Sequence, residues 1–231
     1  MRGFEVSAGQ LCLGGVPLSR LAERAGQTPF FALERRALTR RLQDVRAVLP
    51  PGVHLHYAVK ANPMPALLGW MAERVDGMDV ASSAELTAAL NAGCSPQSIS
   101  FAGPAKRDAE LRQAVAAGVL LHVESLGELR RLIAVSESLN IRARVGLRVN
   151  PDFELRTAGM RMGGAGQVFG LDSADVPQAL ALAAHAALAF EGFHVYAGSQ
   201  VLQADLLIQS MHRTLDMLQA WCQVLSLIHI S

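Results

Sequence analysis

Hydrophobic and polar residues follow two different spacings along this chain, and the two alternate from residue 34 onwards. Between residues 34 and 49 the apolar positions Leu38, Leu42, Val45 and Leu49 recur at helical spacing, with arginines on the other side. Shorter segments alternate apolar and polar residues with a period of two, as strands with one buried face do. The strands predicted in this way cover residues 53–60, 77–81, 98–103, 119–125, 142–150 and 188–198.

Helical segments separate these strands. They cover residues 65–75, 85–92, 107–118, 126–139, 175–187 and about 203–224. Ser83 and Gly93 have the residue types of a helix start and a helix stop. Strands and helices that alternate in this manner predict an α/β protein with a parallel sheet.

Two architectures fit this alternation, an open doubly wound sheet and a closed (β/α)8 barrel of the TIM type. The first strand–helix turn lacks the G-x-G-x-x-G of a dinucleotide fold, and the strands have one apolar face and one polar or small face. We therefore predict the barrel, incomplete with about six βα units, with the second face inside. That inner face would carry His54, His56, Lys60, Asp79, Ser100, Ala102, His122, Glu124, Arg144, Gly146, Arg148, His194 and Tyr196.

The first three dozen residues lack this regularity. They predict a short strand, a turn at Gly14 and Gly15, a short helix and a further strand at residues 29–33. The predicted domains are therefore an N-terminal strand and helix segment (1–34), a partial barrel (35–224) and a tail (225–231).

Composition narrows the classes of function. Hydrophobic residues make up 51% of the 231 residues and charged residues 18%, with a formal net charge of +1. This provides a sizeable core and no charged block that would favour nucleic acid or a membrane surface. The three cysteines are far apart and show no metal-ligand spacing, which predicts a cytoplasmic protein without a metal site.

Lys60 ends the first barrel strand, and the alternation aims it at the same space as Asp79, Arg148 and Tyr196. A lone lysine in this place either extends its stem towards water or acts as a nucleophile. A partly desolvated amine near cations loses its proton more readily and can form an imine. On a barrel, the imine joins the lysine either to a carbonyl substrate, as in aldolases, or to pyridoxal phosphate.

The segments around these positions resemble a known family. YAVKAN (57–62) is similar to the pyridoxal-lysine motif of the fold type III decarboxylases, the alanine racemase-like barrels that include diaminopimelate and ornithine decarboxylases. DVASSAEL, SISFAGPAK, VESLGEL, LRVNP and GFHVYAGSQ resemble the motifs of the following strands, in order and over nearly the whole chain. Within the family, GVHLHYAVKANPMPAL and MRMGGAGQVFG look most like the type associated with the exosortase A system.

The resemblance implies a cofactor and a reaction. The cofactor would be pyridoxal 5'-phosphate, and an amino acid of the diaminopimelate, ornithine or lysine kind would be decarboxylated through a Schiff base on Lys60. Asp79 and Glu85 would be the acidic pair near the cofactor, and Arg148 would lie beneath its ring as part of a polar floor.

Three further residues are implied as cofactor ligands. Ser199, in the AGSQ segment, would hold a phosphate oxygen. Tyr196 stands where many family members have a histidine that stacks on the pyridine ring, and a tyrosine ring can also stack. His194 lies on the same face and would assist it.

The family also implies parts that this sequence lacks. A complete barrel has eight strands, and a phosphate-binding glycine loop, an acid for the pyridine nitrogen and a C-terminal β-domain would follow the sixth helix. We therefore expect a C-terminally truncated chain of weak or no activity, whose N-terminal segment belongs to the missing β-domain. At full length we expect a homodimer. We expect it to bind a small amino-acid substrate and to bind neither nucleic acid nor a membrane.

Other functions stay open at this point. A racemase or an aldolase-type lyase would use the same lysine, and a non-catalytic barrel would hold pyridoxal phosphate without turnover. Absorbance of a pyridoxal imine separates cofactor users from aldolases, and product analysis separates a racemase from a decarboxylase.

Overall fold

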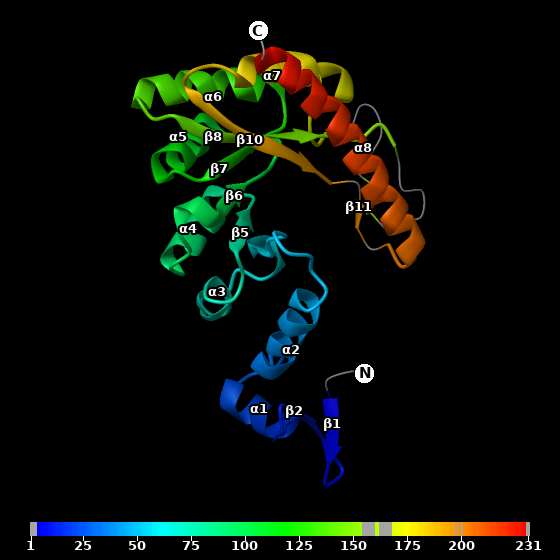
Figure 1. Ribbon diagram of the computed structural model, residues 1–231. Helices are drawn as coiled ribbons and strands as arrows, with labels where there is room; N and C mark the ends of the chain where they lie inside the picture. Colours follow the sequence, from blue (N-terminus) through cyan, green and yellow to red (C-terminus); the bar gives the residue numbers. More distant parts are fainter. Residues whose placement is uncertain (1–3, 154–159, 162–167, 197, 200, 230–231) are drawn as a thin grey trace. The chain divides into compact units, whose positions relative to one another are not determined.

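The computed structural model describes residues 4–153, 160–161, 168–196, 198–199 and 201–229 (Figure 1). The chain forms two compact units, Met1–Leu55 and His56–Ser231. The predicted boundary at residue 34 lies inside the first unit, and the division into three domains stays a prediction.

The first unit contains a small antiparallel sheet and two helices. The sheet has the order β1-β2-β3, and its strands are β1 Phe4–Ser7, β2 Gln10–Leu13 and β3 Val16–Pro17. Gly14 and Gly15, with φ of +58° and +77°, make the predicted turn between β2 and β3. Helices α1 (Leu18–Ala25) and α2 (Arg35–Arg46) follow. The strand predicted at residues 29–33 is wrong, because these residues pair with no strand in the part of the chain that the structure describes, and Pro29 has no N–H to donate to one.

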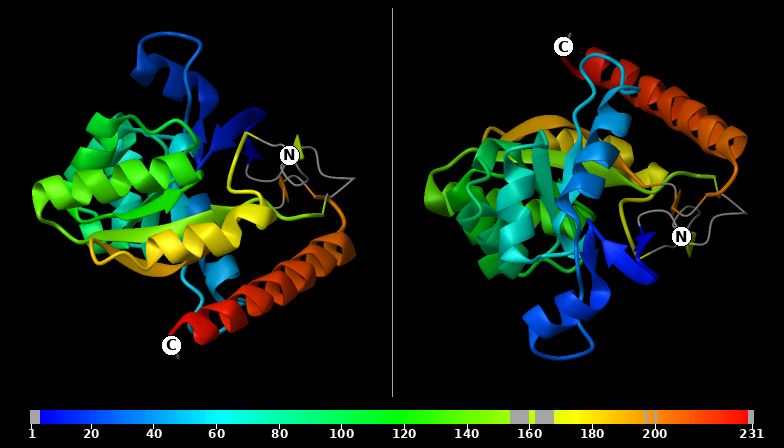
Figure 2. Two further views of the ribbon diagram at one scale, coloured as in Figure 1. Left: turned by 90° about the horizontal axis from the view of Figure 1, so that it is seen from above. Right: turned by 90° about the horizontal axis from the view of Figure 1, so that it is seen from below.

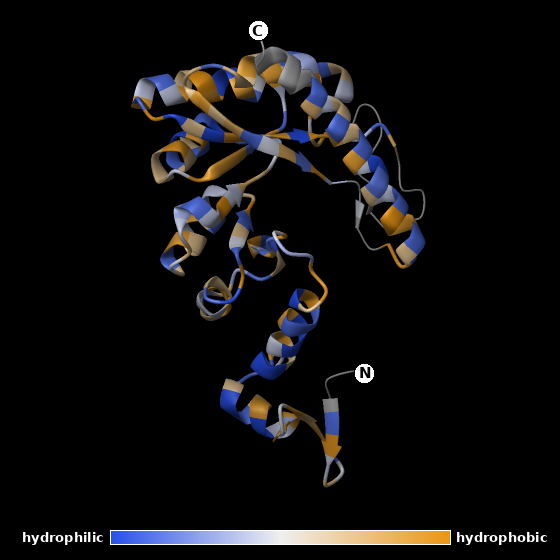
Figure 3. Cartoon of the chain, in the orientation of Figure 1, coloured by the Kyte–Doolittle hydropathy of each residue, from blue (hydrophilic) through white to orange (hydrophobic). Residues whose placement is uncertain are grey.

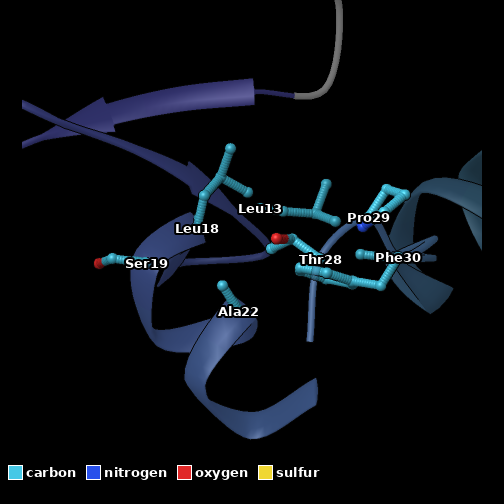
Figure 4. Close-up of a pocket in the computed structure, with 8 residues that line it drawn as sticks. Leu13, Leu18, Ser19, Ala22, Thr28, Pro29 and Phe30 are labelled. Carbon is cyan, nitrogen blue, oxygen red and sulfur yellow. The ribbon is translucent and has the colours of Figure 1, made fainter. Parts of the chain in front are cut away.

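A hollow of ≈ 560 Å³ lies in this first unit (Figure 4). Apolar and hydroxyl side chains of β2, α1 and the segment after α1 line it, and none of them carries an acid or a base. The lining residues are Leu13, Leu18, Ser19, Ala22, Thr28, Pro29, Phe30 and Ala32. This hollow therefore offers no groups for the chemistry that the sequence predicts.

A parallel sheet organises the second unit. Its strand order is β10-β8-β7-β6-β5-β4, so neighbours in space are successive barrel strands along the chain. The strands are β4 His56–Ala58, β5 Gly77–Val80, β6 Ile99–Phe101, β7 Leu120–Val123, β8 Ala143–Val149 and β10 Leu188–Val195. The predicted parallel sheet is confirmed, and an order without reversal excludes the doubly wound alternative.

Helices cover one face of this sheet (Figures 1 and 2). Helix α4 contacts β5 and β6, α5 contacts β7, α6 contacts β8, and α7 contacts β8 and β10. The helices are α3 Pro65–Ala72, α4 Ser83–Asn91, α5 Asp108–Ala117, α6 Leu126–Leu139, α7 Val176–Ala183 and α8 Ala204–His229. Short elements complete the unit: η1 Val59–Ala61, η2 Pro96–Ser98, η3 Ser173–Asp175, and the antiparallel pair β9 Met160–Arg161 and β11 Gly198–Ser199.

The core lies between the helices and the apolar face of the strands, and polar and apolar positions interleave along β8 and β10 (Figure 3). The strand residues that fill it are all at most 2% exposed: Met78, Val80, Ile99, Phe101, Leu121, Val123, Val145, Leu147 and Val149. The opposite face carries the polar residues, as the alternation predicts.

Two predicted boundaries shift in the structure. Strand β4 is shorter than predicted, because Val59 turns into the core and places Lys60 on η1 rather than on a strand. The N-cap of α4 is Ser82 rather than Ser83, since the Ser82 hydroxyl accepts the N–H of Glu85 at 3.2 Å. Among the helices of the described residues, none combines the length and apolarity needed to cross a bilayer.

Candidate functional site

Lys60 lies on a short turn directly after β4. The fully buried Val59 anchors this turn, the Tyr57 hydroxyl donates to the Asn62 carbonyl at 3.1 Å, and the Asn62 N–H donates to the Val59 carbonyl. The backbone of YAVKAN is therefore fixed. The Lys60 side chain is exposed and makes no hydrogen bond or ion pair with any residue that the structure describes.

The chain has two lysines, and the second lies in the opposite environment. Lys106 is 4% exposed, and its Nζ is 2.6 Å from a carboxylate oxygen of Glu128. The same Nζ donates to the carbonyls of Gly103 and His122 at 2.6 and 2.8 Å. The Lys106 amine is thus enclosed by an ion pair and two hydrogen bonds, which leaves Lys60 as the lysine amine open to a ligand.

Asp79 on β5 contacts the strand that leads to Lys60. It lies opposite Ala58 on β4 and Ser100 on β6 in the register of the sheet. Its Oδ1 is 3.0 Å from His56 Nδ1 and accepts the Ser100 hydroxyl at 2.5 Å. Gly77 makes room for the His56 ring, since a Cβ there would lie 2.6 Å from it.

The charges of this pair are set by their contact. Burial acts to raise the pKa of Asp79, but the hydrogen bonds from His56 and Ser100 outweigh it and hold that pKa below its usual value. The same hydrogen bond raises the pKa of His56, against the opposing effect of burial. An anionic Asp79 beside a readily protonated imidazole is the result.

Arg148 and Glu124 form a buried ion pair at the ends of β8 and β7. Their side chains are 10% and 1% exposed, and Arg148 Nη1 donates to Glu124 Oε1 at 2.9 Å. The backbone N–H groups of Gly103 and Gly170 donate to the same carboxylate, at 2.6 and 3.2 Å. The Arg148 guanidinium also lies 5.0 Å from the centre of the Phe169 ring. Arg148 is thus held by partners from separate segments of the chain.

His122 on β7 and His194 on β10 are in ring contact, with centroids 4.5 Å apart. Their Nδ1 atoms are buried without a hydrogen-bond partner among the described residues. Burial and the repulsion between the two rings lower the pKa of His122 to about 3. Burial and the charge of Arg148 lower that of His194 to about 4. The charge of Asp79 acts on both pKa values in the opposite direction and is outweighed.

The remaining predicted residues lie at the margins of this cluster. Glu85 is in the first turn of α4, where its carboxylate accepts the Ala81 N–H at 2.7 Å. Tyr196 is half-buried and directly follows β10. Ser199 pairs through its backbone with Met160, and its side chain lies outside the described residues. Their cofactor roles stay predictions.

The structure therefore brings together Asp79, Arg148 and His194, with Lys60 on the turn after β4. The period of two placed His122 and Glu124 on the inner face, but no motif in the sequence assigned them a role. Their importance is visible only in the structure, where His122 contacts His194 and Glu124 contacts Arg148. Within the part of the chain that the structure describes, no group of three or more His, Cys, Asp or Glu residues could hold a metal ion.

Comparisons with known proteins show the family to which this chain belongs. The family model for the pyridoxal-binding domain of pyridoxal-dependent decarboxylases matches residues 35–229. A diaminopimelate decarboxylase of Zymomonas mobilis is 35% identical over 86% of this chain and 48% of its own length. An L-glutamyl-[BtrI acyl-carrier protein] decarboxylase of Niallia circulans is 33% identical over 83% of this chain and 45% of its own length. The chain thus spans about half the length of these relatives.

Solved structures show the same likeness. Diaminopimelate decarboxylase of Helicobacter pylori, complexed with L-lysine, superposes with a TM-score of 0.81 and 26% identity over 89% of this chain and 53% of its own. AQ1208 of Aquifex aeolicus gives a TM-score of 0.81 and 29% identity over 96% of this chain and 52% of its own. These likenesses confirm the predicted α/β class and a partial barrel of the TIM type.

Proposed function

The chain belongs to the pyridoxal-dependent decarboxylase family, and from this premise we propose that the whole protein is a pyridoxal phosphate-dependent amino-acid decarboxylase, a carboxy-lyase. Lys60 is the residue that attaches the cofactor covalently through its aldehyde. The contrast between the two lysines supports this most, since the Lys60 amine is exposed whereas Lys106 is enclosed in an ion pair.

The groups of this face fit pyridoxal phosphate. An exposed primary amine can condense with an aldehyde, and Asp79 and Arg148 supply an anion and a cation on the same face. The Nδ1 atoms of His122 and His194 can each form a hydrogen bond, and no described residue is their partner. When bound, the pyridinium ring of this cofactor accepts the electron pair that a breaking Cα–carboxylate bond releases.

The residues of the protein would supply fixed charges around the bound cofactor and substrate. Asp79 stays ionised through His56 and Ser100, and with Glu85 it forms the proposed acidic pair. Arg148 presents a cation whose position Glu124 fixes, and this cation forms the polar floor of the site.

The other proposed ligands follow β10. His194 and Tyr196 offer ring surfaces at the end of the strand. Ser199 holds a phosphate oxygen through its hydroxyl, the role that the sequence resemblance implies.

The proposed substrate is an amino acid of the diaminopimelate, ornithine or lysine kind. Two relatives indicate which substrates to test. One is named a diaminopimelate decarboxylase, and the other acts, by its name, on a glutamyl group on an acyl-carrier protein. We also propose a homodimer for the whole protein. A racemase and a non-catalytic cofactor-binding barrel are the alternative functions.

Carbon dioxide release by the whole protein with added pyridoxal phosphate tests the proposal. We expect release from at least one of these amino acids, and none after Lys60→Ala, because that change removes the attachment point. The control Arg41→Ala removes an exposed cation of α2 and should leave release unchanged. Inversion of the amino acid without carbon dioxide would indicate a racemase, and bound cofactor without any turnover would indicate the non-catalytic barrel.

A further inference from the structure

Two imidazoles meet on the inner face of the sheet although their strands are not neighbours. His122 belongs to β7 and His194 to β10, and β8 lies between these strands. Their ring centroids are 4.5 Å apart with an interplanar angle of 38°. A contact across an intervening strand requires that this strand leaves space at the crossing point.

Gly146 on β8 provides that space. It lies directly opposite His122 in the register, and a Cβ at Gly146 would be 2.6 Å from His122 Nδ1. Gly192 lies opposite Gly146 on β10, so two successive strands have no side chain in this row. The His122 ring therefore extends over β8 towards His194.

Both rings are neutral near neutral pH, because burial lowers the pKa of His122 to about 3 and that of His194 to about 4. A neutral imidazole has one nitrogen that donates and one that accepts a hydrogen bond. The Nδ1 atoms of both rings are buried and have no partner among the residues that the structure describes. Histidines that merely filled the core would be expected to have these atoms paired.

We propose, on the basis of the proposed function, that His122 is a cofactor-contacting residue that forms, together with His194, a neutral imidazole wall of the pyridoxal phosphate pocket. His194 lies opposite Arg148 of the proposed site in the register of β10 and β8, and the orphaned Nδ1 atoms leave hydrogen-bonding groups unused beside it. The wall offers ring surface and hydrogen-bonding nitrogens without a competing positive charge.

Titration of the protein with pyridoxal phosphate, followed by absorbance, tests this role. His122→Leu fills much of the same space with an apolar side chain but lacks both nitrogens, so we expect cofactor affinity to fall about tenfold and the visible band to shift. His122→Asn restores a polar atom near the Nδ1 position and should recover most of that loss. His185→Ala, which removes an exposed histidine after α7, is the matched control and should bind as the wild type does.

If His122→Leu does not fold, His122→Ala with added imidazole replaces it, and imidazole should then restore affinity. Wild-type affinity and an unchanged band in His122→Leu, or the absence of imidazole rescue in His122→Ala, would overturn the role of His122. Borohydride reduction of the wild type loaded with pyridoxal phosphate, run in parallel, distinguishes a failure of this inference from a failure of the proposed function. Labelled Lys60 with an unaffected variant refutes this inference alone, whereas an unlabelled wild type refutes the proposed function and this inference with it.

Discussion

Individual residues of the same type have different chemistry at this site because of what they contact. Lys60 is exposed, whereas Lys106 forms an ion pair with Glu128 and donates hydrogen bonds to two carbonyls. His56 and His122 both belong to the inner face. Contact with Asp79 raises the pKa of His56, whereas burial lowers that of His122 to about 3. Neighbours rather than residue type therefore decide which groups are charged.

This difference predicts how stability depends on pH. His122 and His194 have folded-state pKa values below the unfolded value of 6.5, so the unfolded chain binds their protons first as the pH falls. When the pH falls from about 7.5 to about 5.5, each of these two histidines should lower the free energy of unfolding by about 1.4 kcal/mol. His56 acts in the opposite direction, because its raised pKa gives a contribution that is present in acid and is lost as the pH rises through that pKa.

Urea unfolding of the wild type and of His122→Asn at both pH values measures how much His122 contributes to the loss of unfolding free energy on acidification. The variant should lose about 1.4 kcal/mol less than the wild type on acidification. His185→Asn changes an exposed histidine and should behave as the wild type does. An equal loss of stability in the wild type and in His122→Asn would show that His122 is not held neutral.

The elements of the second unit could be predicted largely from local sequence. Ser125 is the N-cap of helix α6, where its hydroxyl accepts the Glu128 N–H at 3.1 Å, and this spacing of Ser and Glu is visible in VESLGEL. Strand β4 was predicted too long, because the period of two continues to Lys60 while the chain already turns at Val59. Residues 29–33 were misassigned, because an apolar segment becomes a strand only where a neighbouring strand supplies hydrogen bonds.

The packing of strands β7, β8 and β10 predicts the effect of one added methyl group. In Gly146→Ala, the new Cβ would meet the His122 ring at 2.6 Å, and overpacking of this kind costs about 1–3 kcal/mol. Gly69→Ala, inside α3 with nothing within 4 Å of the new Cβ, should instead be neutral or stabilise by up to about 1 kcal/mol. Thermal or urea unfolding compares the two, and equal stability of both variants would contradict the close contact.

At the scale of the whole molecule, the sequence predicted the sheet and the face that carries the chemistry, but not the contacts within that face. Alternation alone placed Asp79, Arg148 and His194 on one side of the strands. The contact between His122 and His194 depends on an empty position at Gly146 on a third strand. The enclosure of Lys106 depends on Glu128, 22 positions away in the sequence. Such relations require the three-dimensional register of the sheet.

The central claim is that Lys60 carries the cofactor, and the two lysines of the chain make a direct test possible. The protein is loaded with pyridoxal phosphate, reduced with borohydride, digested and mapped by mass spectrometry. We predict a reduced pyridoxyl group on Lys60 and none on Lys106, whose amine is buried in its ion pair. A label on Lys106, or a loaded protein in which Lys60 stays unmodified, would contradict the account.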